Sequence, residues 1–124
     1  MPLFDTGISA LIEDIHARGL DRDVTVCVIG EFGRTPKINK DAGRDHWARV
    51  NSAILAGGGM RVGQVLGATD KQADSAIDRP IHYQDILATL YNNLGLGDDA
   101  TITTVAGARI RVLPTTARAV RELS

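Results

Sequence analysis

The sequence predicts an α/β fold, and three observations lead to that prediction. Residues 24–29 form an uncharged, largely β-branched segment with the composition of a buried strand. Residues 7–18 and 83–94 repeat apolar side chains at the spacing of an amphipathic helix. The chain has 124 residues, of which 44% are hydrophobic, enough for one core. We therefore expect a single α/β segment over residues 1–124.

The first half predicts a helix and two strands. Asp5 and Thr6 can cap the helix at residues 7–18, and Gly19 follows it at the position where a left-handed residue often ends a helix. The apolar strand at 24–29 has the pattern of a central strand covered on both faces. A second strand is expected at 52–56, and the three glycines after it predict a tight turn.

The second half predicts one more helix and a β-rich tail. Residues 62–68 are expected to be extended, and a polar excursion then ends at Pro80. The helix at 83–94 stops at Gly95. The end of the chain, residues 101–123, has β-rich fragments at 101–105 and 109–113 and is expected to form a peripheral hairpin or an extended tail. Either these tail strands complete the sheet, or the chain is part of a larger structure.

Composition excludes several classes of function. The 14 basic residues nearly balance the 15 acidic ones, so no basic field for nucleic acid is present. The single cysteine, Cys27, lies inside the apolar strand, where a buried thiol is expected rather than a nucleophile. The start of the chain lacks the pattern of a signal peptide, and no apolar run is long enough to predict a membrane span.

The loop at residues 31–45 is the expected place for chemistry. It follows a buried strand, it is longer than most loops, and Asp45 and His46 close it. Ligand sites of open α/β sheets lie at the carboxyl ends of the strands. We therefore expect Glu31, Arg34, Asp45 and His46 to gather on that side of the sheet.

A series of motifs resembles a known family. The motifs are GEFGRTP at 30–36, GRDHW at 43–47, LAGGGM at 55–60, GQV at 63–65, GATD at 67–70, and Arg-Pro at 79–80. Together they resemble the bacterial family catalogued as domain of unknown function 1501, over nearly the whole chain. That family is similar to the alkaline phosphatase and sulfatase superfamily. The resemblance implies the C-terminal part of a mixed α/β sheet that carries a two-metal site.

The resemblance assigns metal ligands to two residues. The order of elements is similar to the last third of a metal-dependent phosphomutase of that superfamily, in which a strand ends in an Asp-His-Gly metal motif. Glu31 falls on the aspartate of that motif, Phe32 on the histidine, and His46 on a later histidine ligand. This implies a divalent metal, zinc, manganese, magnesium or calcium, on Glu31 and His46. Phe32 departs from the motif, because a phenyl ring cannot bind metal.

Other roles for the site residues remain open at this stage. His46 can instead donate to a backbone carbonyl, and Asp45 can orient His46 or form a turn. Arg34 and Arg44 are both candidates for binding an anion, because a guanidinium can donate hydrogen bonds to two oxygens at once. In the alternative, both arginines neutralise Glu31 and Asp45 and so stiffen the loop.

Two functions follow from this resemblance and its departures. The first is a metal-dependent protein that hydrolyses or binds a phosphate or sulfate ester. The alternative is a non-catalytic binding or structural module, because the nucleophile and the other metal ligands of the superfamily precede the part that resembles this chain. Family members are commonly exported, which implies an extracytoplasmic location. The uncovered apolar strand predicts self-association or a need for an N-terminal part.

Overall fold

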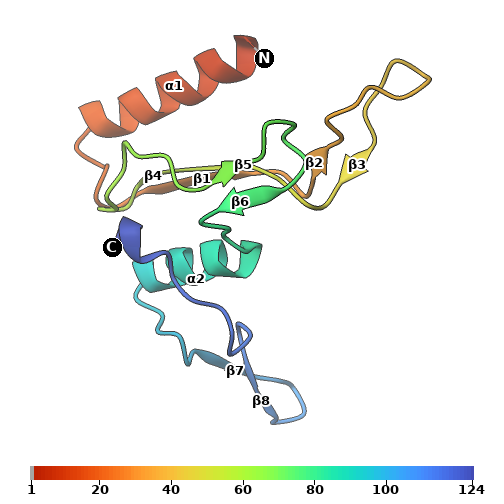
Figure 1. Cartoon of the computed structure of the whole chain (residues 1–124). Helices are drawn as coiled ribbons and strands as arrows, with labels where there is room; N and C mark the ends of the chain where they lie inside the picture. Colours follow the sequence, from red (N-terminus) through yellow and green to blue (C-terminus); the bar gives the residue numbers. More distant parts are fainter. Residues whose placement is uncertain (1) are drawn as a thin grey trace. The chain divides into compact units, whose positions relative to one another are not determined.

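The computed structural model describes residues 2–124, which form two compact units divided after Pro80 (Figure 1). The first unit contains α1 (Pro2–Ala17), β1 (Thr25–Ile29), β2 (Gly33–Arg34), β3 (His46–Trp47), β4 (Ala53–Gly57), β5 (Ala68–Thr69) and β6 (Ala76–Asp78). The second contains α2 (Tyr83–Asn93), β7 (Thr101–Thr103), β8 (Arg109–Arg111) and the 3-10 helix η1 (Arg121–Leu123). The mixed α/β character expected from the sequence is confirmed. The prediction that residues 1–124 correspond to one part of a larger domain stays a prediction.

Helix α1 begins earlier than the sequence pattern predicts. It starts at Pro2, a residue that the first turn of a helix accepts because its missing N–H has no partner there anyway. Asp5 and Thr6 therefore lie inside the helix and do not cap it, and the Thr6 hydroxyl donates to the Pro2 carbonyl at 3.0 Å. The expected caps were wrong, because Pro2 can begin the helix several residues before its apolar spacing starts.

The end of α1 is as expected. Gly19 adopts a left-handed φ of 68°. Its N–H donates to the carbonyl of His16 at 2.9 Å, and the N–H of Leu20 donates to the carbonyl of Ile15 at 3.0 Å. This pair of bonds satisfies the last carbonyls of the helix and fixes the direction in which the chain leaves it.

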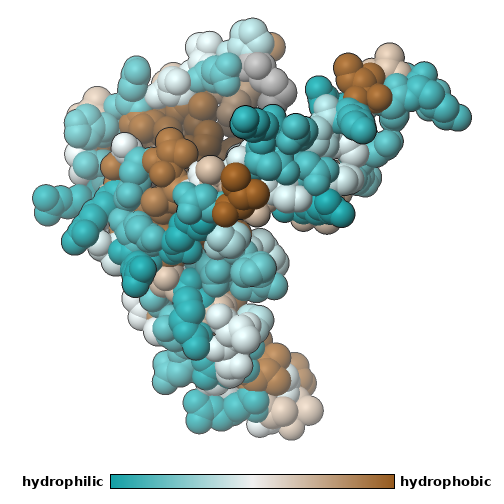
Figure 2. Space-filling view, viewed as in Figure 1, coloured by the Kyte–Doolittle hydropathy of each residue, from teal (hydrophilic) through white to brown (hydrophobic). Residues whose placement is uncertain are grey.

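Strands β1 and β4 pair with each other in antiparallel register, from Thr25 opposite Gly57 to Ile29 opposite Ala53. Helix α1 packs against this sheet, and Figure 2 shows apolar atoms gathered where they meet. The expectation of a strand covered on both faces is wrong for residues 2–124, because β1 is only half-buried and Ile29 is 43% exposed. The four sheets in this part of the chain are all two-stranded and antiparallel. The alkaline-phosphatase-like arrangement therefore stays a prediction.

The glycine turn after β4 is confirmed. Gly57, Gly58 and Gly59 all have positive φ, at 73°, 61° and 70°. The N–H of Gly58 donates to the carbonyl of Val24 at 2.9 Å. A Cβ at Gly57 would overlap that same carbonyl oxygen, so the turn requires glycine at this position.

The second unit holds the most buried side chains. Helix α2 lies within one residue of the predicted span, and β7 pairs with β8 as a hairpin. Of the residues that the structure describes, the buried ones are Ala88, Thr89, Ala117, Val120 and Leu123. Three of these belong to the tail, so the expectation that residues after 101 are peripheral is wrong for its last part. The cause is long-range packing, which short apolar fragments do not reveal.

Hydrogen bonds tie this last segment to α2. The Thr89 hydroxyl accepts a bond from the Val120 N–H at 2.8 Å and donates to the Asp85 carbonyl at 2.7 Å. The Asp85 carboxylate accepts from the His82 N–H at 3.1 Å, as in a capping box, and from the Arg118 N–H at 2.9 Å. Within residues 2–124, neither helix combines the length and hydropathy needed to cross a bilayer.

Candidate functional site

The predicted loop at 31–45 is largely an ordered hairpin. Strands β2 and β3 pair antiparallel, with Gly33 opposite Trp47 and Arg34 opposite His46, and the hairpin extends away from the β1–β4 sheet (Figure 1). A Cβ at Gly33 would overlap the carbonyl oxygen of Val50. Glycine at position 33 therefore lets the two backbone segments approach closely at the base of the hairpin.

One face of this hairpin carries Phe32, Arg34 and His46. Directly opposed residues of an antiparallel pair point to the same face, which places the side chains of Arg34 and His46 together. The rings of Phe32 and His46 lie with their centroids 3.9 Å apart and their planes at 33°. The Arg34 guanidinium lies over the Phe32 ring, with Cζ 5.5 Å from its centroid. Phe32 therefore packs against both the imidazole of His46 and the guanidinium of Arg34.

Asn39 organises the loop between the two strands. Its Oδ1 accepts bonds from the N–H groups of Asp41 at 3.0 Å and Gly43 at 2.9 Å. Its Nδ2 donates to Oδ1 of Asp45 at 2.8 Å. Its backbone N–H donates to the Gly43 carbonyl at 2.8 Å, and its own carbonyl accepts from Ala42 at 3.1 Å. Sequence reasoning did not single out this residue, although Asn is common in turns of this kind.

The two arginines stiffen the loop through carbonyl groups. Arg44 Nη1 donates to the carbonyls of Thr35 and Pro36, both at 2.6 Å. Arg34 Nη1 donates to the carbonyl of Arg44 at 3.3 Å. Among the described residues, no ion pair joins either of these arginines to Glu31 or Asp45. The stiffening is therefore as expected, but carboxylates are not its partners.

Asp45 is turned toward the loop. Its backbone is fixed on both sides by Thr35, whose N–H donates to the Asp45 carbonyl at 3.0 Å and whose hydroxyl accepts from the Asp45 N–H at 3.1 Å. Its carboxylate accepts the bond from Asn39. No hydrogen bond joins it to His46 in the described part of the chain, so orientation of His46 by Asp45 stays a prediction.

Glu31 and His46 are exposed, and no hydrogen bond or ion pair within residues 2–124 engages either side chain. Glu31 lies in a bend before β2, whereas His46 is on β3. No group of three or more His, Cys, Asp or Glu side chains that could hold a metal occurs in the described residues. The role of these two residues as metal ligands therefore stays a prediction.

Trp47 anchors the hairpin to the β5–β6 turn. Its Nε1 donates to the carbonyl of Asp74 at 2.9 Å. The Arg49 guanidinium stacks over the indole, with Cζ 5.1 Å from the ring centroid, and Arg49 Nη1 lies 2.9 Å from Oδ2 of Asp74. These contacts support the interpretation of Trp47 as a structural anchor.

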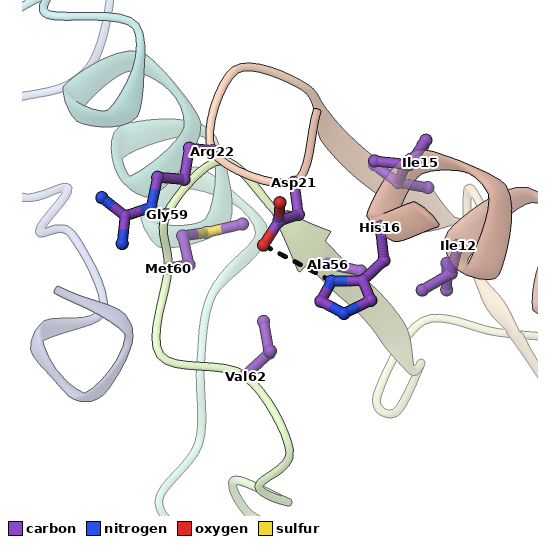
Figure 3. Close-up of a pocket in the computed structure, with 11 residues that line it drawn as sticks. Ile12, Ile15, His16, Asp21, Arg22, Ala56, Gly59, Met60 and Val62 are labelled. Carbon is purple, nitrogen blue, oxygen red and sulfur yellow. Dashed lines mark ion pairs between the residues drawn. The ribbon is translucent and has the colours of Figure 1, made fainter. Parts of the chain in front are cut away.

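The first unit also contains a pocket that the sequence did not predict. A pocket of about 420 Å³ lies in the first unit between α1 and the β1–β4 sheet, lined by Ile12, Ile15, Val26, Ala56 and Met60 among others. At its edge, Nδ1 of His16 lies 3.6 Å from Oδ2 of Asp21, and Figure 3 shows the ring directed at that carboxylate. The lining comes from several separate segments, each of which has an ordinary pattern alone. The triple glycine that borders it was the only local signal.

Cys27 lies in β1, away from the hairpin, and is half-buried. Burial raises the pKa of its thiol above the ordinary value, because the thiolate is poorly solvated there. A thiol with a raised pKa is a poor nucleophile near neutral pH, in agreement with the structural role expected from the sequence.

The family model that matches the chain covers residues 1–124 and carries the description "Protein of unknown function (DUF1501)". The chain belongs to this family. No curated protein and no solved structure matches it. Membership in DUF1501 confirms the family resemblance carried by the glycine-rich motifs and assigns no activity to the chain.

Proposed function

We propose that the β2–β3 hairpin contributes part of a binding site for phosphate or sulfate esters, in which Glu31 and His46 hold a divalent metal and Arg34 contacts the ester oxygens. The observation that carries the proposal is the availability of Glu31 and His46. Among the described residues, neither is taken by a hydrogen bond or an ion pair. Carboxylate oxygen and imidazole nitrogen suit zinc and manganese.

Support for His46 comes from its setting. Phe32 stacks on the face of the imidazole at 3.9 Å between centroids, and such stacking leaves the two nitrogens at the ring edge accessible. The alternative role, donation to a loop carbonyl, has no counterpart in the hydrogen bonds of residues 2–124. The ring is thus held by packing, and its nitrogens remain accessible to a ligand.

Support for Arg34 comes from the cross-strand register. Arg34 is directly opposite His46, so an anion bound at a metal on the imidazole would lie within reach of the guanidinium. Only one recorded bond, the one from Nη1 to the Arg44 carbonyl, uses the donors of Arg34. The other N–H groups can grip two oxygens of a phosphate or sulfate group. Nη1 of Arg44, by contrast, already donates hydrogen bonds to two loop carbonyls. Arg44 is therefore the weaker candidate for anion binding.

A bound divalent metal would polarise the ester oxygens and lower the pKa of a bound water. Hydrolysis also needs a nucleophile and further ligands, and the resemblance places Phe32, which cannot bind metal, on one ligand of the metal motif. The Phe32–His46 stack specifically favours the second candidate function, a non-catalytic module that binds the ester without cleaving it. For residues 1–124 alone we therefore expect weak metal binding and no turnover.

Paramagnetic NMR tests the site. Mn²⁺ added to the ¹⁵N-labelled chain should broaden the amide signals around Glu31 and His46 selectively. The effect should be lost in His46→Ala and reduced in Glu31→Gln, whereas His16→Ala, which removes another exposed histidine, should retain it. Broadening that centres elsewhere, or that survives in His46→Ala, contradicts the proposed ligands.

A second measurement tests the ester. In the presence of Zn²⁺, p-nitrophenyl phosphate or sulfate should shift the signals of Arg34, and Arg34→Gln should weaken this binding about tenfold. Arg22→Gln, outside the hairpin, is the matched control and should bind as the unmodified chain does. Release of p-nitrophenol no faster than from His46→Ala supports the binding module, and faster release supports a hydrolase.

A further inference from the structure

We infer that Asn39 is a positioning residue of the proposed site, which holds Asp45, and through it His46, in the orientation needed for ligand binding. The inference rests on the proposed function and adds to it a residue that no motif had marked. Asn39 lies at the far end of the hairpin from the β1–β4 sheet, away from the metal ligands in sequence. Its role therefore has to act through other residues.

The side chain of Asn39 joins two structures that are otherwise separate. Its Oδ1 accepts the N–H groups of Asp41 and Gly43 and so closes the turn. Its Nδ2 donates to the carboxylate of Asp45 at 2.8 Å, a bond to a charged group and so among the stronger kinds. The amide therefore couples the shape of the turn to the residue directly before His46.

The turn itself needs this support. Ala42 adopts a φ of 58°, in the left-handed region that residues with a Cβ rarely occupy. The residues on both sides of Ala42 are held by Oδ1 of Asn39, and the Ala42 N–H donates to the Asn39 carbonyl. Backbone in a rarely populated conformation persists only where its surroundings determine it. The hydrogen bonds of Asn39 hold the backbone of Ala42 in this conformation.

The bonds around Asp45 show how the effect is passed on. Thr35 fixes the backbone of Asp45 through two bonds, and Arg44 fixes Thr35. With its backbone held, the carboxylate has one described partner, the amide of Asn39. Loss of that bond frees the carboxylate of the residue directly before His46 in the sequence. A freed carboxylate can turn toward the imidazole or compete for the metal, and either change alters binding at His46.

Asn39→Asp separates positioning from folding. The substitution keeps an oxygen that can accept the N–H groups of Asp41 and Gly43, but it replaces the donor to Asp45 with a second carboxylate. A purely structural Asn39 predicts that Asn39→Asp lowers the stability of the turn but leaves Mn²⁺ affinity and the His46 signals unchanged. Positioning predicts that Mn²⁺ affinity at His46 changes about tenfold, as found for residues that orient metal ligands, while the amide protons of Asp41 and Gly43 keep their exchange protection.

Two further variants complete the test. Asn92→Asp adds the same charge on α2, in the other unit, and should leave Mn²⁺ affinity unchanged. In the double variant Asn39→Asp with Asp45→Asn, the repulsion is removed and a donor is restored with the roles exchanged, so binding should return toward that of the unmodified chain. Failure of the double variant to recover any affinity contradicts coupling through Asp45.

A readout without metal keeps this inference separate from the proposed function. The imidazole signals of His46 should move in Asn39→Asp and return in the double variant. If Mn²⁺ fails to bind at His46 but these signals follow the expected pattern, the metal site is wrong and the positioning role stands. If the His46 signals of Asn39→Asp match those of the unmodified chain, the positioning role is wrong, whatever the metal does.

Discussion

Replacement of Thr89 by valine should destabilise the second unit, because it removes one oxygen from a buried position. Thr89 is 5% exposed, and its hydroxyl accepts the N–H of Val120, which is 2% exposed. Valine has nearly the same shape but offers no acceptor. The Val120 N–H would then be buried without a partner, which costs about 1–3 kcal/mol.

The added methyl group offsets part of this cost. Burial of one methyl-sized group contributes about 0.8 kcal/mol, so a net loss of about 0.2–2 kcal/mol in the free energy of unfolding is expected. The other bond of the hydroxyl adds little, because the Asp85 carbonyl lies one turn earlier in α2 and can keep its helical partner. For a chain of this length the melting temperature should fall by about 1–8 °C.

Thermal and urea unfolding followed by circular dichroism measure the loss, and hydrogen exchange at the Val120 amide locates it. Thr89→Ser keeps the oxygen and should retain the bond to Val120, at the cost of a methyl group. Thr116→Val makes the same chemical change at an exposed position and should be nearly neutral. Thr89→Val with the stability of the unmodified chain and a protected Val120 amide would refute the reasoning.

Three further predictions concern the first unit. Gly57→Ala should lower the free energy of unfolding by at least about 2 kcal/mol, because the new Cβ combines a positive φ with overlap on the Val24 carbonyl. Gly59→Ala has a similar φ but meets no heavy atom of the described residues, so it should cost about 1 kcal/mol. Urea unfolding that gives the two variants equal stability contradicts this prediction. Iodoacetamide should alkylate Cys27 more slowly in the folded chain than in urea at about pH 8. Because the thiol ionises at lower pH in the unfolded chain, the free energy of unfolding should fall as pH rises above about 8.5. Equal alkylation rates and a free energy of unfolding that does not change with pH would show that burial does not raise the pKa. Since β1 and β4 pair only with each other among the described residues, their open edges predict self-association, and a light-scattering mass of one 13.3 kDa chain at high concentration with cooperative unfolding would contradict it.

The parts of the fold that were predicted from the sequence are those specified by local pattern. Helix α2 is predicted by its apolar spacing. The turn at 57–59 is predicted by three consecutive glycines, which favour a tight turn with positive φ. Sheet pairing was not predictable in the same way. An uncharged strand such as β1 has the pattern of a covered strand wherever its neighbours come from, and residues 2–124 supply only β4.

The candidate site divides along the same line. The sequence indicated Arg34 and His46 as members of one site, and the hairpin register places them opposite each other. It did not indicate Asn39, because the role of that residue depends on bonds to Gly43 and Asp45 that exist only after the loop closes. Thr89 was missed for a similar reason, since its partner at Val120 is distant in sequence.

The placement of the aromatic residues gives the two units separate optical signals. The chain has one tryptophan and two tyrosines. Trp47 is in the first unit, where its indole is bonded to Asp74 and stacked on by Arg49, and both tyrosines belong to α2 in the second. Tryptophan fluorescence, excited at wavelengths that tyrosine does not absorb, therefore reports whether the hairpin is anchored. Tyrosine absorbance reports on α2. A single unlabelled sample can thus reveal whether the two units melt together or one after the other.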